Sequence, residues 1–300
     1  MVIDLHPPGR DSGEGAFALA AGAIVFALVL SAAILSVSGN VSMGLHETSL
    51  RLSEIASSVS SLNSPAGAPP GYALPSPSSP PSPGTRLSLP LLEGRPSMGN
   101  SSAGISLVEF SDFECPYCAT FVSESLPGIL PYVESGRVRL VFKQFPLDSA
   151  CNPLLEVPFH ADACAAAKAS LCAFEQDRFW GMHDLLFAGQ QNLSAPALEG
   201  FARILGLDMA DFSDCLNSRD YSDYFSRDAL DGEAAEVRGT PAFLVLLPSR
   251  LTQEKVSDIA AAAGRSAQQI AFLETEDGRT AVRISGALPP EVFAAVFDSA

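Results

Sequence analysis

The sequence predicts an α/β fold for a domain that occupies about residues 101–300. Two observations lead to this prediction. A strand, a helix and a second strand follow one another between residues 105 and 144, and strand-like and helical runs return after residue 238. A β-α-β unit places its two strands parallel, with a right-handed crossover. The helix-rich stretch between the two parts predicts an all-helical insertion at about residues 148–236.

Apolar alternation and helical spacing locate the individual elements. The expected strands are Ile105–Phe110, Arg137–Gln144, Gly239–Leu247 and Thr280–Ile284. The expected helices are Pro116 to about Tyr132, a region from about His160 to Glu236 with breaks near Asn192 and Gly206, Thr252–Ala263, and Pro290–Phe297. Pro127 should kink or interrupt the first of these helices, because a proline has no N–H for the helical hydrogen bonds.

Composition bounds both the size of the core and the class of partner. The 300 residues are 47% apolar, which is enough for one core of about 200 residues with attached segments. Lys and Arg number 18 against 34 Asp and Glu, which gives a formal net charge of −16. Such a charge argues against nucleic acid and against an anionic membrane surface as binding partners.

The N-terminal part is expected to hold a membrane anchor. A tail over residues 1–15 precedes an uncharged apolar run, Ala16–Val37, which is long enough to span a hydrocarbon core of about 30 Å as a transmembrane helix. A cleaved signal peptide is the alternative. The run is long for a signal peptide, and Arg10 is the only arginine or lysine before it.

Two segments connect this run to the domain. Residues 38–63 carry heptad-like apolar positions and predict a juxtamembrane helical stalk, with a weak dimerising coil as the alternative. Residues 64–100 are rich in proline and serine, most densely at 75–83, and predict a stiff polyproline-type linker. These patterns leave the oligomeric state open.

The sequence Cys115-Pro-Tyr-Cys118 is the motif that carries chemistry. It follows the strand Ile105–Phe110 and opens a helix. The N-terminus of a helix favours negative charge, so Cys115 should form a thiolate readily, with Cys118 one turn inward. A zinc site would need four ligands, and the other cysteines begin 33 residues away without a second CxxC. The motif therefore predicts redox chemistry that uses a Cys115–Cys118 disulfide, with no metal and no other cofactor.

Three motifs in this order resemble the DsbA-like thiol-disulfide oxidoreductases of the thioredoxin superfamily. They are Val108–Cys118 (VEFSDFECPYC), Phe174–Phe187 (FEQDRFWGMHDLLF) and Gly239–Phe243 (GTPAF). The resemblance covers about residues 97–247 and 280–298. It implies a thioredoxin fold with a helical domain inserted after the β-α-β unit, which agrees with the element order predicted above.

The resemblance assigns roles to residues of these motifs. Cys115 is implied to be the attacking thiol, at an exposed helix edge, and Cys118 the thiol that resolves the mixed disulfide. Glu109 is implied to lie beneath the CxxC and to relay protons to Cys118, with a pKa raised by burial. An exposed carboxylate at the end of the strand is the alternative reading of Glu109.

Thr240 and Pro241 are implied to face the CxxC, with a cis bond at Pro241 and the Thr240 backbone free to pair with an extended substrate. Pro116 and Tyr117 complete the expected active-site surface. The Pro-Tyr dipeptide departs from strongly oxidising relatives, which often carry histidine there, and is shared with glutaredoxins that act as reductants. None of the four histidines adjoins the motif in the sequence.

The remaining cysteines, Cys151, Cys164, Cys172 and Cys215, allow three pairings. Cys164 and Cys172 are expected on one helix, about 12 Å apart along its axis, which is beyond disulfide reach. Two schemes remain. The favoured scheme joins Cys151 to Cys164 across a short proline-containing loop. It joins Cys172 to Cys215 as a bond between two helices of the inserted domain, as the resemblance implies for some relatives. Both bonds would be structural.

Residues 248–279 lie outside the resemblance and are expected to form a second insertion. Ser266–Gln269 is typical of a capping box and predicts a short helix after Thr252–Ala263. In a thioredoxin sheet this insertion would follow the end of its strand that is remote from the cis-proline. We therefore expect it to lie away from Cys115 and to serve docking or stability.

These features together predict a membrane-tethered enzyme that introduces disulfides into proteins outside the cytoplasm. Its clients would be unfolded or reduced proteins. The family implies reoxidation by a membrane partner of the DsbB or VKOR kind, and the thiol chemistry favours an extracytoplasmic catalytic domain on a single-pass anchor. A disulfide reductase or isomerase of the same fold, and a non-catalytic thioredoxin-fold adaptor, are the alternatives.

Overall fold

The computed structural model describes residues 86–88, 90 and 92–300. The expected tail (1–15), transmembrane helix (16–37) and juxtamembrane stalk (38–63) lie outside these residues, as does most of the expected linker. Within the described part of the chain, no helix is both long enough and apolar enough to cross a bilayer.

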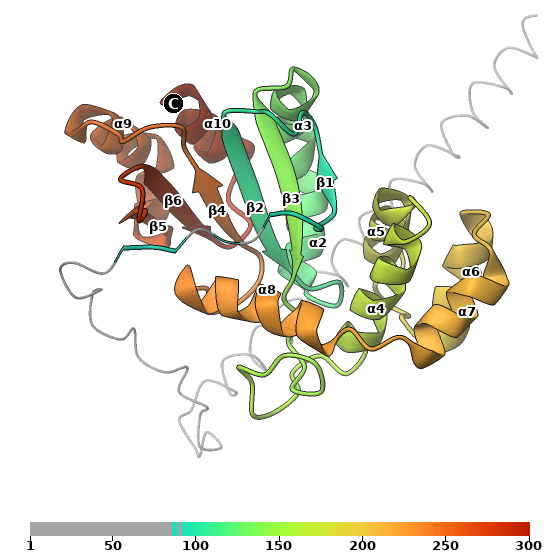
Figure 1. Cartoon of the computed structure of the whole chain (residues 1–300). Helices are drawn as coiled ribbons and strands as arrows, with labels where there is room; N and C mark the ends of the chain where they lie inside the picture. Colours follow the sequence, from blue (N-terminus) through green and yellow to red (C-terminus); the bar gives the residue numbers. More distant parts are fainter. Residues whose placement is uncertain (1–85, 89, 91) are drawn as a thin grey trace, which may run out of the picture. The chain divides into compact units, whose positions relative to one another are not determined.

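One mixed sheet lies at the centre of the domain (Figure 1). Across the described residues its strand order is β1-β3-β2-β4-β6-β5. The strands are β1 (Ser97–Met98), β2 (Ile105–Ser111), β3 (Val138–Gln144), β4 (Ala242–Leu246), β5 (Ile270–Glu274) and β6 (Thr280–Ser285). β2 and β3 run parallel, as the β-α-β prediction requires, and the other neighbours run antiparallel. The four expected strands are therefore confirmed to within a few residues, and β1 and β5 are additional.

Helices cover the sheet and form a separate cluster beside it (Figure 1). Their bounds are α2 (Pro116–Thr120), α3 (Leu126–Glu134), α4 (Ala163–Phe174), α5 (Phe179–Ala188), α6 (Ala195–Ile204), α7 (Met209–Ser218), α8 (Ser222–Ala234), α9 (Gln253–Ala263) and α10 (Pro290–Asp298). Helices α4 to α7 make up the inserted cluster, whose apolar core extends to the two cysteines of the CxxC. The breaks expected near Asn192 and Gly206 are confirmed, and the chain also turns after α4 and after α7.

Successive residues of β2 face opposite sides of the sheet, and each side has its own apolar core. Leu107 packs with residues of α3, α9 and α10, whereas Val108 packs with Ala235 at the end of α8. Glu109 shares the face of Leu107, which is the face covered by the helix that follows the CxxC. The strand therefore places Glu109 on the side of the sheet covered by that helix, as the resemblance implies.

The helix that opens at Pro116 continues to Glu134 but contains one wide turn. Between α2 and α3, Phe121–Ser125 forms a π-helical segment in which the Leu126 N–H reaches the Phe121 carbonyl oxygen. The irregularity expected at Pro127 thus lies just before that proline. Its physical reason is the missing N–H of Pro127, because a wider turn accommodates the lost hydrogen bond without ending the helix.

Two disulfides match the predicted pairing. Cys151–Cys164 closes the loop between β3 and α4, and Cys172–Cys215 joins α4 to α7. Their Cα–Cα separations are 5.9 and 5.8 Å, which suits a disulfide. One bond therefore constrains the approach to the inserted helices, and the other constrains those helices themselves.

The folded part begins before residue 101, which corrects the expected end of the linker. The Leu87 N–H donates to the Glu274 carbonyl oxygen at 2.8 Å, at the end of β5. Arg95 is buried, and its Nε lies 2.6 Å from a carboxylate oxygen of Asp228 on α8. The proline- and serine-rich composition concealed these contacts, because pairing at a sheet edge uses backbone groups that every residue carries.

The second insertion builds the opposite edge of the sheet. Helix α9 is confirmed within the expected Thr252–Ala263, and the Thr252 hydroxyl caps it by accepting from the Lys255 N–H. The short helix expected to open at Ser266–Gln269 does not continue beyond Gln269. That stretch is the end of a 3₁₀ helix, Gly264–Gln269, which leads directly into β5, and the backbone groups of β5 pair with β6.

The pairing of β5 also corrects where this insertion lies. Ile270 at the start of β5 is opposite Ile284 on β6, and Ile284 is opposite Phe243 on β4. Phe243 is two residues from Pro241. The insertion therefore begins at the end of β4 that is far from Pro241. Its strand β5, two positions from β4 in the sheet, starts at the height of the expected active site.

Candidate active site

The CxxC lies where β2 ends and α2 begins. Cys115 caps α2, and Pro116 occupies its first turn, where a missing N–H is tolerated. Neither Cys115 nor Cys118 is bonded to another cysteine, so the structure represents the dithiol form. Cys115 is only 3% exposed, which corrects the expectation of an exposed attacking thiol, whereas Tyr117 is 67% exposed. Cys115 is covered because the inserted helices pack against the CxxC.

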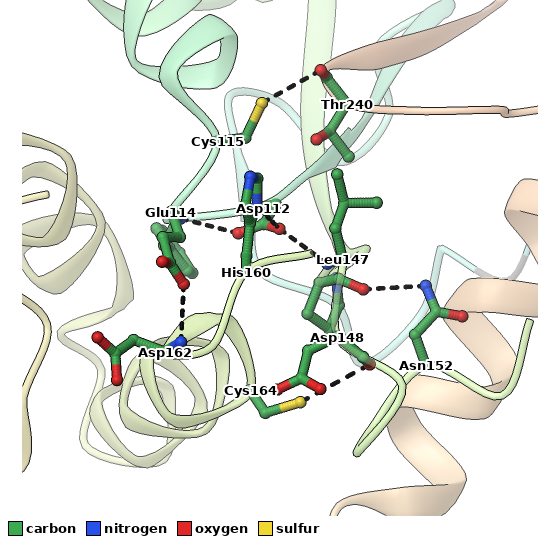
Figure 2. A network of polar contacts seen from close by, with 12 residues as sticks. Asp112, Glu114, Cys115, Leu147, Asp148, Asn152, His160, Asp162, Cys164 and Thr240 are labelled. Atoms are coloured by element: carbon green, nitrogen blue, oxygen red, sulfur yellow. Dashed lines mark hydrogen bonds and ion pairs between the residues drawn. The ribbon is translucent and has the colours of Figure 1, made fainter. Parts of the chain in front are cut away.

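Thr240 and Pro241 approach the CxxC from the start of β4. The peptide bond between them is cis. The thiol of Cys115 donates to the Thr240 carbonyl oxygen with an Sγ–O distance of 3.3 Å (Figure 2). Sequence reasoning expected a Thr240 backbone free for substrate. In the dithiol form its carbonyl group instead contacts Cys115, so a substrate strand would replace this contact.

The pKa of Cys115 is lowered to about 6. The largest cause is the hydrogen bond from the Cys118 thiol, which stabilises the Cys115 thiolate, and desolvation by burial opposes it. The Thr240 side chain and the backbone N–H groups of Cys118 and Tyr117 lower the pKa further by hydrogen bonding to the thiolate. Those N–H groups belong to the first turn of α2, so the helix start contributes as the sequence predicts.

Cys118 has the opposite character. Its side chain is fully buried, and burial raises its pKa well above the ordinary value, with the adjacent Cys115 raising it further. A group with such a pKa holds its proton firmly at neutral pH. Cys118 therefore needs a partner that takes or returns this proton whenever its sulfur forms or leaves a disulfide.

Glu109 is the residue to which the resemblance assigns that role. It is fully buried, and neither carboxylate oxygen has a hydrogen-bond partner within the described part of the chain. Burial raises the pKa of Glu109 to about 7, so the alternative of an exposed carboxylate is wrong. Ser111 lies two residues further along the same face of β2 and is also buried. Its hydroxyl lowers the pKa of Glu109 and of Cys118, against the effect of burial on each.

Several residues that sequence reasoning did not select hold the loop before Cys115. Gln190, just after α5, donates through Nε2 to the carbonyl oxygens of Phe113 and Cys115 at 2.8 and 2.9 Å. Asp112 is buried and receives hydrogen bonds from several neighbours (Figure 2). Asp112 had a local signal, as a polar residue directly after a strand. Gln190 had none, since only the docking of the inserted helices brings it to the loop.

A pocket of about 500 Å³ opens beside the CxxC, between the active-site helix and α5. Its lining is mostly small and apolar: Pro116, Ala119, Thr120, Val122, Ser123, Asp184, Phe187 and Ala188. Of the four residues of the CxxC, Pro116 alone lines this pocket. Among the described residues, no group of three or more His, Cys, Asp or Glu side chains could hold a metal ion.

Comparison with known proteins agrees with this geometry. The family described as thioredoxin matches residues 92–246. A probable disulfide bond formation protein D from Bacillus cereus is 27% identical over 157 residues, which cover 50% of this chain and 68% of that protein. A crystal structure of alpha-DsbA1 from Wolbachia pipientis has the same fold, with a TM-score of 0.51 at 20% identity, covering 70% of this chain and 92% of that one.

A third relative shares only one segment with this chain. The Na(+)/H(+) antiporter NhaA 3 of Salinispora tropica is 34% identical over 148 residues, which cover 49% of this chain and 21% of the antiporter. The chain thus spans about a fifth of the length of such antiporter relatives. The family match covers more than half of the chain and includes the CxxC, the β-α-β unit and the cis-proline strand. The chain therefore belongs to the thioredoxin family.

Proposed function

We propose that this protein introduces disulfides into reduced client proteins outside the cytoplasm by dithiol–disulfide exchange. The observation that carries the proposal is the opposed acidity of the two cysteines. The pKa of Cys115 is lowered to about 6, whereas that of the buried Cys118 is raised well above its ordinary value. The Cys115 sulfur is therefore suited to form and release mixed disulfides with client proteins. The Cys118 sulfur is suited to close or open the internal disulfide.

The exchange balances as follows. In the oxidised enzyme a client thiolate attacks the Cys115 sulfur, the Cys115–Cys118 bond breaks, and Cys118 leaves as a thiolate that takes up a proton. A second client thiolate then attacks the client sulfur of the mixed disulfide, and Cys115 leaves as a thiolate. The client loses two electrons and two protons. The enzyme gains the two electrons and the proton on Cys118, and the second proton goes to solvent while Cys115 remains a thiolate.

Glu109 serves the step at Cys118. With a pKa raised to about 7 it carries a proton in part of the molecules at neutral pH. It can donate this proton as Cys118 leaves and remove it when the disulfide re-forms.

The direction of the reaction follows from Cys115. A stabilised thiolate is a good leaving group and favours the reduced enzyme, which makes the oxidised enzyme an oxidant. The Pro-Tyr dipeptide supports a reductase or isomerase as the second candidate, because glutaredoxins share it. The two disulfides, Cys151–Cys164 and Cys172–Cys215, support an oxidising compartment, where such bonds persist.

Partners and location are part of the same proposal. The mostly apolar pocket lined by Pro116, and the exposed Tyr117 ring, suit unfolded client segments. Reoxidation would come from a membrane partner of the DsbB or VKOR kind. The apolar run Ala16–Val37 supports a membrane anchor with the catalytic domain on the extracytoplasmic side.

The test is oxidative refolding of reduced ribonuclease A by the oxidised full-length protein. We expect stoichiometric formation of ribonuclease disulfides by wild type and none by Cys115→Ser. A wild-type protein that reduces insulin disulfides but does not oxidise ribonuclease would assign the chain to the reductases. A protein that does neither, while binding reduced ribonuclease, would support the adaptor.

A further inference from the structure

The loop between β3 and α4 is fastened to the active-site loop at both of its ends. Near its start, the Leu147 N–H donates to Asp112 Oδ2 at 2.7 Å. Near its end, the Asp162 N–H donates to Glu114 Oε2 at 2.7 Å. Figure 2 shows these contacts meeting just below Cys115. The loop is therefore a fixed part of the site.

This loop brings a histidine to the site from far along the chain. His160 Nδ1 lies 2.7 Å from Asp112 Oδ2, and the His160 backbone N–H donates to the Leu147 carbonyl oxygen at 3.1 Å. The Cys151–Cys164 disulfide closes the same loop around His160. Figure 2 also marks Cys164 Sγ near the Asp148 carbonyl oxygen at 3.9 Å, which is a packing contact, because a disulfide sulfur has no proton to donate.

The charges around His160 are predominantly negative. Asp112 and Glu114 belong to the loop that leads into Cys115, and Asp162 lies two residues beyond His160. The pKa of His160 is raised, first by the hydrogen bond with Asp112, against desolvation, and further by the charges of Asp112, Cys115 and Glu114. Asp112 is fully buried at its side chain, whereas the His160 side chain is 21% exposed. The Asp112 carbonyl oxygen accepts from the Cys115 N–H at 3.1 Å, so this buried carboxyl group belongs to the turn that leads into the thiolate. An ionised carboxylate buried in this turn would oppose thiolate formation unless it were neutralised.

We infer that His160 is a positioning residue that supplies the counter-charge for Asp112 and thereby stabilises the Cys115 thiolate. This inference rests on the proposed function and assigns His160 a part in stabilising the charge on Cys115. The Pro-Tyr dipeptide holds no histidine between the two cysteines. The loop closed by Cys151–Cys164 brings one from outside the motif, on the side of Asp112.

The test compares thiolate titrations of the reduced full-length protein by ultraviolet absorbance. His160→Asn keeps a hydrogen-bond donor near the position of Nδ1 but removes the charge. In this variant we expect the pKa of Cys115 to rise by about half a unit to one unit. The equilibrium constant for exchange with glutathione should then change three- to tenfold, at ~tenfold per pKa unit, toward a less oxidising enzyme. Arg203→Gln removes one positive charge from an exposed pair with Glu199 on α6 and is the matched control, with no expected change.

A second measurement uses wild type alone and applies even if the variant fails to fold. Coupling between two sites is reciprocal, so the His160 ring should titrate at a higher pH in the dithiol form, which holds the thiolate, than in the disulfide form. Ring NMR signals of His160 in both forms measure this. Equal His160 titrations in the two forms, or a folded His160→Asn protein with wild-type thiolate titration, would overturn the inference. Neither readout requires turnover, so a failure of the proposed oxidase activity would be seen separately, in ribonuclease refolding.

Discussion

The Cys115 thiol lies 3.3 Å from the carbonyl oxygen of Thr240, a residue 125 positions away in the sequence. The sheet produces this contact, because Phe110 near the end of β2 is paired with Ala242 at the start of β4. The residues just beyond both strand ends are Cys115 on one side and Thr240 and Pro241 on the other. The reactive sulfur and the backbone expected to receive substrate are thus positioned by the same antiparallel pair.

The first prediction separates the roles of the two cysteines. Cys118→Ser should accumulate mixed disulfides between Cys115 and client proteins, because no internal thiol remains to release them. Cys115→Ser should form none. Non-reducing electrophoresis after incubation with a disulfide-containing client measures both. Normal client release by Cys118→Ser would contradict the two-cysteine exchange.

The second prediction concerns stability as a function of pH in the two redox forms. The pKa of Cys115 is lowered from 9.0 to about 6 in the folded dithiol protein, so its stabilising effect is present above the unfolded value and is lost as the pH falls through 6. The free energy of unfolding of the reduced form should therefore increase relative to that of the oxidised form between pH 6 and 9. The gain is at most about 1 kcal/mol per pH unit, less where solvent screens the thiolate.

Urea denaturation of both redox forms at several pH values measures this difference. The oxidised form has no Cys115 thiol to titrate and serves as the control. A reduced form whose relative stability is flat over this range would mean that Cys115 has an ordinary pKa.

The third prediction concerns Glu109→Gln, which replaces the carboxyl group by an amide of nearly the same shape. The pKa of Glu109 is raised from 4.5 to about 7, so the wild type loses stability as the pH rises from the unfolded to the folded value. The variant should lack this loss and be more stable than wild type above pH 7, by up to about 3 kcal/mol. Denaturation at pH 4 and pH 8 measures the difference.

The same variant should slow one chemical step. Attack by Cys115 should be nearly unchanged, whereas resolution by Cys118 should slow, because the buried thiol has lost its proton acceptor. Stopped-flow kinetics should show accumulated mixed disulfide. Unchanged rates for both steps would remove Glu109 from the mechanism.

The fourth prediction ranks the two structural disulfides. In the chain-entropy description, a bond that closes a longer loop constrains the unfolded chain more strongly. Cys172 and Cys215 are separated by 43 residues and Cys151 and Cys164 by 13, so their double-alanine variants should lose about 4 and about 3 kcal/mol, respectively. Denaturation of each double variant measures the loss. A larger loss from the shorter loop would show that local packing, not chain entropy, dominates.

The sequence was sufficient for features with local signals or ordered motifs. Apolar alternation or a distinctive dipeptide marks three of the elements. They are the strand before Cys115, the helix after it and the β4 strand after Pro241. The position of Glu109 beneath the CxxC came from the resemblance. The strands and the helix needed only the residue pattern, the chain order and the geometry of a parallel β-α-β unit.

The features that were missed depend on tertiary contacts. The strand β5 lacks a distinctive pattern and forms because the edge of β6 offers backbone partners. Burial of Cys115 results from the packing of the inserted helices, and His160 reaches Asp112 only through a loop whose ends and disulfide hold it there. No periodicity within a short stretch of sequence reports such contacts.

The reduction potential of the Cys115–Cys118 pair decides whether this protein acts as an oxidant. Equilibration of the full-length protein with glutathione redox buffers, followed by alkylation of free thiols, gives the value. We expect a potential near that of strong oxidants, about −120 mV. A value near about −270 mV, typical of thioredoxin-like reductants, would contradict it.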